Sequence, residues 1–178
     1  MKIITQGIAA ATLAAMLLTA CGKQEASTAP APAPAPAADQ SASAPAVEVA
    51  EYALPDGLAG AGYCALDVVN GQPPAGATAI TNSDVLFGGW AADASKQVPT
   101  QALFVLKGSE KTYSVPLDVR GDRPDVAAAL SSEPLKSSGY NLPVRLTNVV
   151  PGTYELLIML GGDNPAVCML PATLVVSN

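Results

Sequence analysis

The sequence predicts an all-β sandwich of about seven strands with one short helix, preceded by a disordered tether. From residue 52 onward, short apolar runs alternate with Gly, Pro, Asn and Asp, a pattern typical of β-proteins. The region before Tyr52 contains no aromatic residue. Such a segment cannot bury enough apolar surface to offset the entropy lost when its backbone becomes ordered. We therefore expect one folded domain over residues 52–178.

Seven apolar runs are predicted to be strands: 63–69, 84–91, 102–107, 112–118, 142–149, 153–160 and 167–176. In the first run Cys64, Leu66 and Val68 alternate with Ala65, Asp67 and Val69, which predicts that the strand has an inner face. The run 102–107 alternates less cleanly, which suits a strand buried on both sides. The number and spacing of the runs suggest an immunoglobulin-like sandwich.

One stretch departs from the strand pattern. Residues 123–130 contain good helix formers, and Pro124 stands near their start, where its missing N–H is tolerated. Asp125 would then lie in the first turn, where a negative charge is favourable. We predict a single short helix here.

Two cysteines lie in the predicted domain, Cys64 on its first strand and Cys168 on its last. Cysteines of exported proteins usually pair in an oxidising compartment. The first and last strands of Greek-key sandwiches are commonly neighbours. We therefore expect a Cys64–Cys168 disulfide, and two free thiols are the alternative.

The chain begins with a pattern typical of an export signal. Lys2 precedes an apolar run at 8–18 that is too short to span a bilayer, and Leu18-Thr19-Ala20-Cys21 follows. These four residues resemble the lipobox of bacterial lipoproteins. The resemblance implies that residues 1–20 are removed and that Cys21 carries the lipid. The alternative is an ordinary secreted protein cleaved after Ala20.

The residue after the lipobox cysteine is Gly22. Some lipoprotein families use aspartate at this position as an inner-membrane retention signal. Its absence implies transfer to the outer membrane, with the domain facing either the periplasm or the cell surface.

Residues 21–51 are predicted to be the lipid-bearing cysteine and a linker. Prolines alternate with alanine at Pro30, Pro32, Pro34 and Pro36, so the chain is expected to be extended and polyproline-II-like. A Pro-rich recognition motif is the alternative. The run lacks the basic or aromatic residues that such ligands usually carry, so a spacer is the better interpretation.

Composition argues against several functions. The net charge is −6 with nine Lys and Arg residues, which opposes nucleic-acid binding. Histidine is absent, so the common Ser-His pairs and most zinc sites are excluded. We expect no metal, no cofactor and no catalytic residue. The weak enzyme or calcium candidates lack surrounding motifs; they are Asp122 with Asp125, Lys136 with Ser137 or Ser138, and Asp163-Asn164.

Four short motifs occur in order along the domain: Gly89-Trp90-Ala-Ala-Asp93, Arg123-Pro-Asp125-Val126, Ser138-Gly139-Tyr140 and Pro151-Gly152-Thr-Tyr154. This set resembles a β-sandwich module of bacterial surface-polysaccharide proteins and envelope lipoproteins. The resemblance covers most of the chain from Cys64 to Val176. It implies a fold and an envelope setting, and no established activity.

Two interpretations of the motif residues remain open. In one, Trp90, Asp93, Arg123, Asp125 and Tyr140 form a sugar-binding patch with aromatic rings for stacking. In the other, Trp90 fills the core and Arg123 pairs with Asp93 or Asp125. We expect the second, because the chain has a single Trp.

Arg120-Gly121-Asp122 spells the integrin-binding tripeptide. It falls in a predicted turn, where Gly and Asp are expected for conformational reasons. We therefore do not predict integrin binding.

Together these features predict a lipid-anchored envelope interaction module that presents a β-sandwich to a protein or glycan partner. The alternative is a passive structural or accessory lipoprotein of an envelope assembly. Membrane attachment would be through Cys21 alone.

Overall fold

The computed structural model describes residues 45–60, 62–161 and 165–178. The predicted signal peptide, Cys21 and the proline run lie outside these residues. Within the described part of the chain, no helix is both long and apolar enough to cross a membrane.

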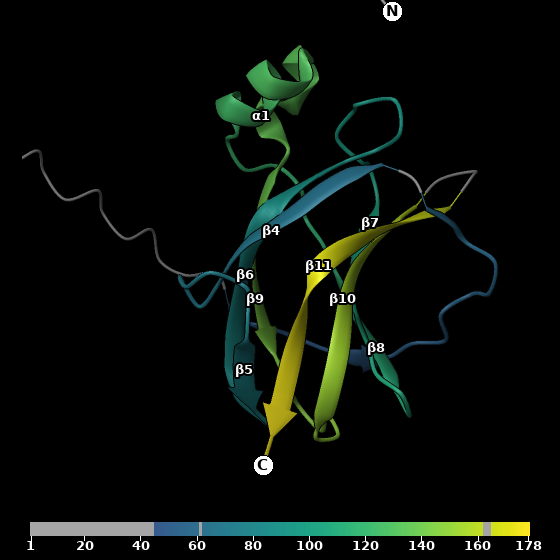
Figure 1. Ribbon diagram of the computed structural model, residues 1–178, viewed down its shortest axis with the longest axis vertical. Coiled ribbons are helices and arrows are strands. Elements are labelled where there is room, and N and C mark those ends of the chain that lie inside the picture. The colour runs from purple at the N-terminus through teal and green to yellow at the C-terminus, as the bar shows by residue number, and fades with distance from the viewer. Residues whose placement is uncertain (1–44, 61, 162–164) are drawn as a thin grey trace, which may run out of the picture. The chain divides into compact units, whose positions relative to one another are not determined.

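The described residues form an all-β sandwich of two sheets, as predicted (Figure 1). The first, here sheet A, has the order β1 (Val47–Glu48), β9 (Gly139–Arg145), β6 (Asp84–Ala92), β4 (Tyr63–Val69). The second, sheet B, has the order β2 (Ala50–Glu51), β8 (Thr112–Pro116), β7 (Ala102–Lys107), β10 (Gly152–Leu160), β11 (Ala166–Ser177), β3 (Ala59–Gly60). Strand β5 (Ala77–Ile80) also pairs with β11.

The chain changes sheets in the order that immunoglobulin-like sandwiches use. Strands β4 and β6 lie in sheet A, β7 and β8 in sheet B, β9 in sheet A again, and β10 and β11 in sheet B. These long strands pair antiparallel, whereas the short strands β1, β3 and β5 pair parallel with β9 or β11. The short strands were not predicted because two to four residues carry no readable alternation.

Most predicted strands match closely, and β9 is the clearest difference. It covers Gly139–Arg145 rather than 142–149. At its start Gly139 pairs with Trp90 of β6. Beyond its end, Asn148 adopts a φ of 56°, a left-handed conformation that a continuing strand cannot contain. The apolar residues Leu146 and Val149 therefore belong to a turn that faces the core, although they look like strand residues in the sequence.

The main core lies between the sheets. Phe87 of β6 and Phe104 of β7 have ring centroids 4.6 Å apart, and Tyr140 of β9 meets Phe104 edge-on at 6.4 Å. Along β7, Phe104 and Leu106 face this core while Val105 is equally buried on the other face of the sheet. The prediction of a strand buried on both sides is confirmed.

A β-bulge interrupts β4. Leu66 pairs with Gly89 and Val68 pairs with Gly88, so Asp67 is an extra residue in the strand. An extra residue reverses the alternation that follows it. Val69 therefore lies in the core and Val68 is only half-buried, so the alternation of Cys64 and Leu66 does not continue to Val68.

The Gly-x-Tyr motif forms a tyrosine corner between β9 and β10. The Tyr154 hydroxyl donates to the carbonyl of Val150, and the Val150 N–H donates to the Tyr113 hydroxyl at 3.2 Å. Burial, as the largest cause, raises the pKa of Tyr154 to about 12. The motif thus has a structural role, because it ties the turn to β8 and β10.

The disulfide is present between Cys64 and Cys168, whose Cα atoms are 6.2 Å apart. It joins β4 at the edge of sheet A to β11 of sheet B, which confirms the prediction that these strands are neighbours.

Each sheet carries a cover on its outer face. On sheet A, helix α1 (Pro124–Leu130) and the 3-10 helix η1 (Glu133–Ser137) form a helical cap that packs on Ala92 and Trp90. On sheet B, residues 46–60 form a strap whose apolar side chains pack on buried residues of β7 and β10. Because β1 and β2 pair with β9 and β8, paired structure begins before Tyr52.

Candidate functional site

Arg123 is the centre of the motif residues. It immediately precedes α1, and its side chain is 22% exposed. Its Nε and Nη2 donate to the two Asp125 carboxylate oxygens at 3.0 and 2.8 Å, and its Nη1 donates to Asp67 Oδ2 at 2.6 Å. The predicted pair with Asp125 is therefore present and bidentate. Asp93 is not a partner of Arg123 in the described structure, and Asp67 was not foreseen.

The ion pairs shift the pKa values of Asp125 and Arg123. The hydrogen bonds from Arg123 are the largest cause that lowers the pKa of Asp125, to about 2. The bonds to Asp125, and next in importance those to Asp67, raise the pKa of Arg123 against the opposing effect of burial. Both shifts favour the charged forms of Arg123 and Asp125.

Asp67 reaches Arg123 because it is the extra residue of the β4 bulge. Bulges re-aim a side chain that the regular pleat would place elsewhere. The sequence held one weak signal of this arrangement, a single acidic residue in an otherwise apolar strand.

Asp93 directly follows β6, and its carboxylate accepts hydrogen bonds from the loop that comes next. Its Oδ1 accepts hydrogen bonds from the N–H groups of Ser95 and Gln97, both at 2.8 Å. In the same loop the Lys96 Nζ donates to the carbonyl of Leu130 at the end of α1, at 3.0 Å. Asp93 is thus a turn-forming residue that connects sheet A to the helical cap.

Trp90 is half-buried rather than in the core between the sheets. It lies on the outer face of sheet A, where it packs against the cap cluster that contains Val126, Ala127 and Leu135. The prediction that Trp90 fills the core is therefore wrong, because the side chain packs under the helical cap. The alternation along β6 faces Phe87 and Ala91 inward, so Trp90 faces the cap.

Tyr140 is buried and its hydroxyl donates to the carbonyl of Ala65 at 3.1 Å. Burial raises its pKa. Gly89 makes this approach feasible, because a Cβ there would lie 2.6 Å from the Tyr140 hydroxyl and 2.1 Å from the Ala65 oxygen. The adjoining motif residue Ser138 is also buried, and its hydroxyl has no hydrogen-bond partner among the described atoms.

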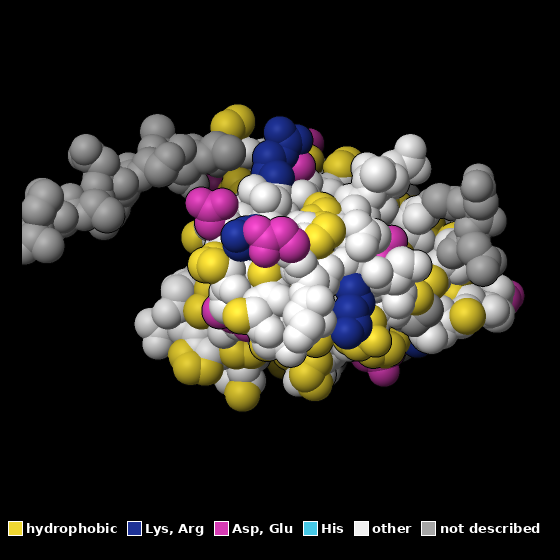
Figure 2. Space-filling model, turned by 90° about the horizontal axis from the view of Figure 1, so that it is seen from above, with side chains coloured by type: hydrophobic (Ala, Val, Ile, Leu, Met, Phe, Trp, Pro, Cys, Tyr) yellow, Lys and Arg dark blue, Asp and Glu magenta, His cyan; other side chains and the backbone are white. Residues whose placement is uncertain are grey.

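Of the five predicted site residues, Arg123 and Tyr140 line a shallow polar hollow of about 310 Å³ on sheet A, beside the helical cap, whereas Trp90, Asp93 and Asp125 do not line it. It is lined by Asp67, Val68, Gly88, Gly89, Gly121, Asp122, Arg123, Gly139, Tyr140 and Asn141. Its exposed rim carries Asp67, Asp122 and Asn141, which offer hydrogen-bond acceptors and an amide. Figure 2 looks down on this end of the domain and shows acidic and basic side chains close together among neutral ones.

The hollow provides no aromatic platform for a sugar ring. Tyr140 is the aromatic residue of its lining, and that side chain is buried. The sugar-binding interpretation required exposed aromatic faces. Hydrogen bonding to a partner remains available at the rim.

Gly121 and Asp122 of the Arg120-Gly121-Asp122 segment line the hollow. Gly121 and Gly139 exchange two backbone hydrogen bonds of 2.7 and 2.9 Å, and Arg120 Nε donates to Asp118 Oδ1 at 2.5 Å. A Cβ at Gly139 would lie 2.9 Å from both the Gly121 oxygen and Arg123 Cγ, so this close approach requires glycine. Gly121 therefore has a structural role, whereas the Arg120 side chain is 80% exposed.

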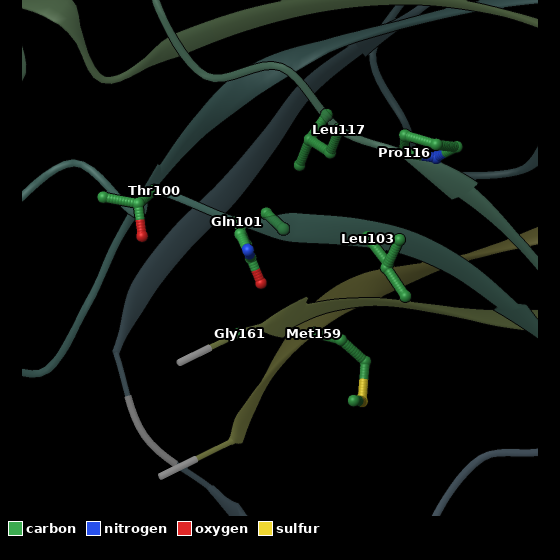
Figure 3. A pocket seen from close by; sticks show the side chains of 8 residues that line it. Thr100, Gln101, Leu103, Pro116, Leu117, Met159 and Gly161 are labelled. Atoms are coloured by element: carbon green, nitrogen blue, oxygen red, sulfur yellow. The ribbon is translucent and has the colours of Figure 1, made fainter. Parts of the chain in front are cut away.

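A second, apolar hollow of about 430 Å³ lies at the ends of β7, β8 and β10. Figure 3 shows Leu103 of β7 between Pro116 and Leu117 on one side and Met159 of β10 on the other. Its polar lining side chains, Thr100 and Gln101, are uncharged. It was not foreseen, because no motif marks it.

The weak enzyme and metal candidates gain no support. No three His, Cys, Asp or Glu side chains of the described residues are grouped closely enough to hold a metal ion. Lys136 is paired with Glu133, and Ser138 is buried. Asp163 and Asn164 lie outside the described residues.

Comparison with known proteins finds no matching family model, no matching curated protein and no matching solved structure.

Proposed function

We propose that this protein is a lipid-anchored interaction module of the bacterial outer membrane. The protein is acylated at Cys21, and residues 22–44 link that anchor to a β-sandwich that engages an envelope protein or glycan. The observation that carries the proposal is Leu18-Thr19-Ala20-Cys21 directly after the apolar run 8–18. The linker, at ~3.1 Å per residue where it is polyproline-like, holds the domain a few tens of ångströms from the bilayer.

The polar hollow is the face that supports an interaction best. Its rim exposes Asp67, Asp122 and Asn141 beside the fixed guanidinium of Arg123. Its carboxylates outnumber its single cation, so an anionic partner would be repelled. Hydroxyl or amide groups of a glycan or protein would find both acceptors and donors there.

A second candidate is a passive accessory lipoprotein. It is favoured by the way the motif residues are used, since Asp93, Arg123 and Tyr140 all bond within the domain. On this alternative the sandwich supports an assembly and its hollow has no ligand.

The anchor is tested by replacing its cysteine. In cells labelled with a fatty-acid analogue, Cys21→Ser is expected to lose the label and leave the membrane fraction. The control is the double variant Cys64→Ser with Cys168→Ser, which should keep the label. A labelled Cys21→Ser protein would contradict the proposal.

The partner is tested with a photo-crosslinking residue placed at Asn141, at the rim of the hollow, or at Thr173, an exposed position of β11. The interaction module predicts crosslinked adducts in intact envelopes when the probe is at Asn141 and none when it is at Thr173. Adding Asp122→Ala to the Asn141 probe should abolish these adducts. Loss of binding to a glycan array by the same Asp122→Ala variant would identify a sugar. The passive lipoprotein predicts that the two probe positions give the same yield of adducts, or none, and that the protein does not bind the glycan array.

A further inference from the structure

The strap, residues 46–60, differs from the rest of the domain in how little of it is buried. None of residues 45–60 has a buried side chain. Tyr52, Leu54 and Leu58 are half-buried over sheet B, and Val49 is half-buried against the main core. The residues beneath it are fully covered, with Val105 0% and Leu157 1% exposed. The strap therefore shields an apolar strip without having a core of its own.

Its attachments are short. At its start β1 pairs only Val47 with Val144 and Glu48 with Arg145 of β9, in parallel. Next along the strap, β2 pairs only Ala50 with Ser114 and Glu51 with Tyr113. At the other end β3 pairs Ala59 and Gly60 with β11 in parallel. The ion pair of Glu51 with Lys111 is exposed, so salt screens it.

The disulfide leaves the strap outside the covalent loop. The loop that Cys64 and Cys168 close runs from the start of β4 to the start of β11, and it includes β5 to β10 and the helical cap. The strap precedes Cys64. Its departure breaks neither the disulfide nor any pairing between the long strands.

We propose that the strap is a releasable cover that opens as a unit while the disulfide-closed sandwich stays folded. Segments with few buried contacts and exposed backbone hydrogen bonds open at lower free energy than a core. Opening uncovers the apolar strip of Val105, Leu157 and Met159 and the outer edge of β8. An exposed strand edge beside an apolar strip is the surface that accepts an added strand.

Release also changes the reach of the domain. The strap follows the linker directly, so opening adds residues 46–60 to it, an extra ~50 Å at about 3.3 Å per residue. This consequence rests on the proposed anchor at Cys21. The opening itself does not.

Hydrogen exchange of the full-length chain tests the proposal. The amides of Val49 and Tyr52, which donate to Arg145 and Thr112, should exchange roughly tenfold or more faster than those of β7 and β10. Leu54→Asp should remove the remaining strap protection, keep that of β7 and β10, and increase binding of the dye 1-anilinonaphthalene-8-sulfonate. The matched control is Val175→Asp on the outer face of β11, which should change neither.

A covalent lock separates opening from general destabilisation. Ala50→Cys with Ser114→Cys would join β2 to β8 at directly opposed positions, which have disulfide-compatible Cα separations. In the locked chain the strap amides should exchange more slowly than in the wild type. Warming the locked chain to just below its melting temperature should not increase its binding of 1-anilinonaphthalene-8-sulfonate. Equal exchange of strap and β10 amides in the wild type, or loss of β10 protection in Leu54→Asp, would overturn the proposal. Either result leaves the proposed anchor untouched, because fatty-acid labelling at Cys21 reports on it separately.

Discussion

The two outer faces of the sandwich are both covered, but by different physical means. Sheet A carries the helical cap, whose Leu135 is fully buried and whose first turn is tied to β4 through Arg123. Sheet B carries the strap, in which no side chain is buried. The cap lies inside the covalent loop closed by Cys64 and Cys168, and the strap lies outside it.

This difference shows that coverage and stability are separate properties. Val105 beneath the strap is as inaccessible as Phe104 in the main core. Its inaccessibility depends on three half-buried side chains of a strap that is held by three short strand pairings, whereas Phe104 depends on both sheets. Equal burial therefore does not imply equal resistance to local opening.

The largest expected effect comes from the disulfide that separates the two covers. Cys64→Ala with Cys168→Ala should lower the free energy of unfolding by about 4 kcal/mol, since a long loop is no longer closed in the unfolded chain. The midpoint of denaturant unfolding measures the loss. An unchanged midpoint would show that the covalent loop does not account for the contrast between cap and strap.

A smaller effect is expected from truncating one apolar contact in each cover. Leu135→Ala should cost about 3 kcal/mol, because it leaves a cavity at a fully buried site. Leu58→Ala, at a half-buried site of the strap, should cost about 1 kcal/mol. Thermal unfolding of both variants gives the comparison. Equal losses would contradict the distinction between the two faces.

Removing the Arg123 side chain should lower the free energy of unfolding moderately. Arg123→Ala loses hydrogen bonds to both Asp67 and Asp125 and should cost about 1–2 kcal/mol. Arg120→Ala is the matched control, because that side chain is 80% exposed and paired only with Asp118. It should melt like the wild type. A normal melting curve for Arg123→Ala with lost partner binding would instead assign Arg123 to recognition.

The smallest expected effect is a dependence of stability on pH that arises from Asp125. The pKa of Asp125 is lowered to about 2 in the folded protein, from an ordinary 3.8. A lowered folded pKa stabilises the protein above the unfolded value, and this contribution is lost as the pH falls from about 4 towards 2. The melting-temperature gap between wild type and Asp125→Asn should be constant above about pH 5 and narrow below pH 4. A gap that widens in acid would reverse the assigned sign.

Local patterns were sufficient for much of this protein. Strands 63–69 and 102–107 match their predicted bounds, and the helix was predicted from Pro124 and the alanines that follow it. The Cys64–Cys168 pair followed from the export context and the order of strands. These features depend on alternation, helix propensity and chain order, all of which can be read along one segment.

Other features depended on which segments meet in space. The pairing of Arg123 with Asp67 joins residues 56 positions apart, and it requires a bulge that the alternation of β4 did not reveal. The strap was assigned partly to the linker because its residues are mostly exposed and its strands pair over only two residues. Trp90 faces the cap rather than the core because of the register of β6. Register, bulges and edge pairing are decided by contacts between distant segments, so they appear only in the tertiary structure.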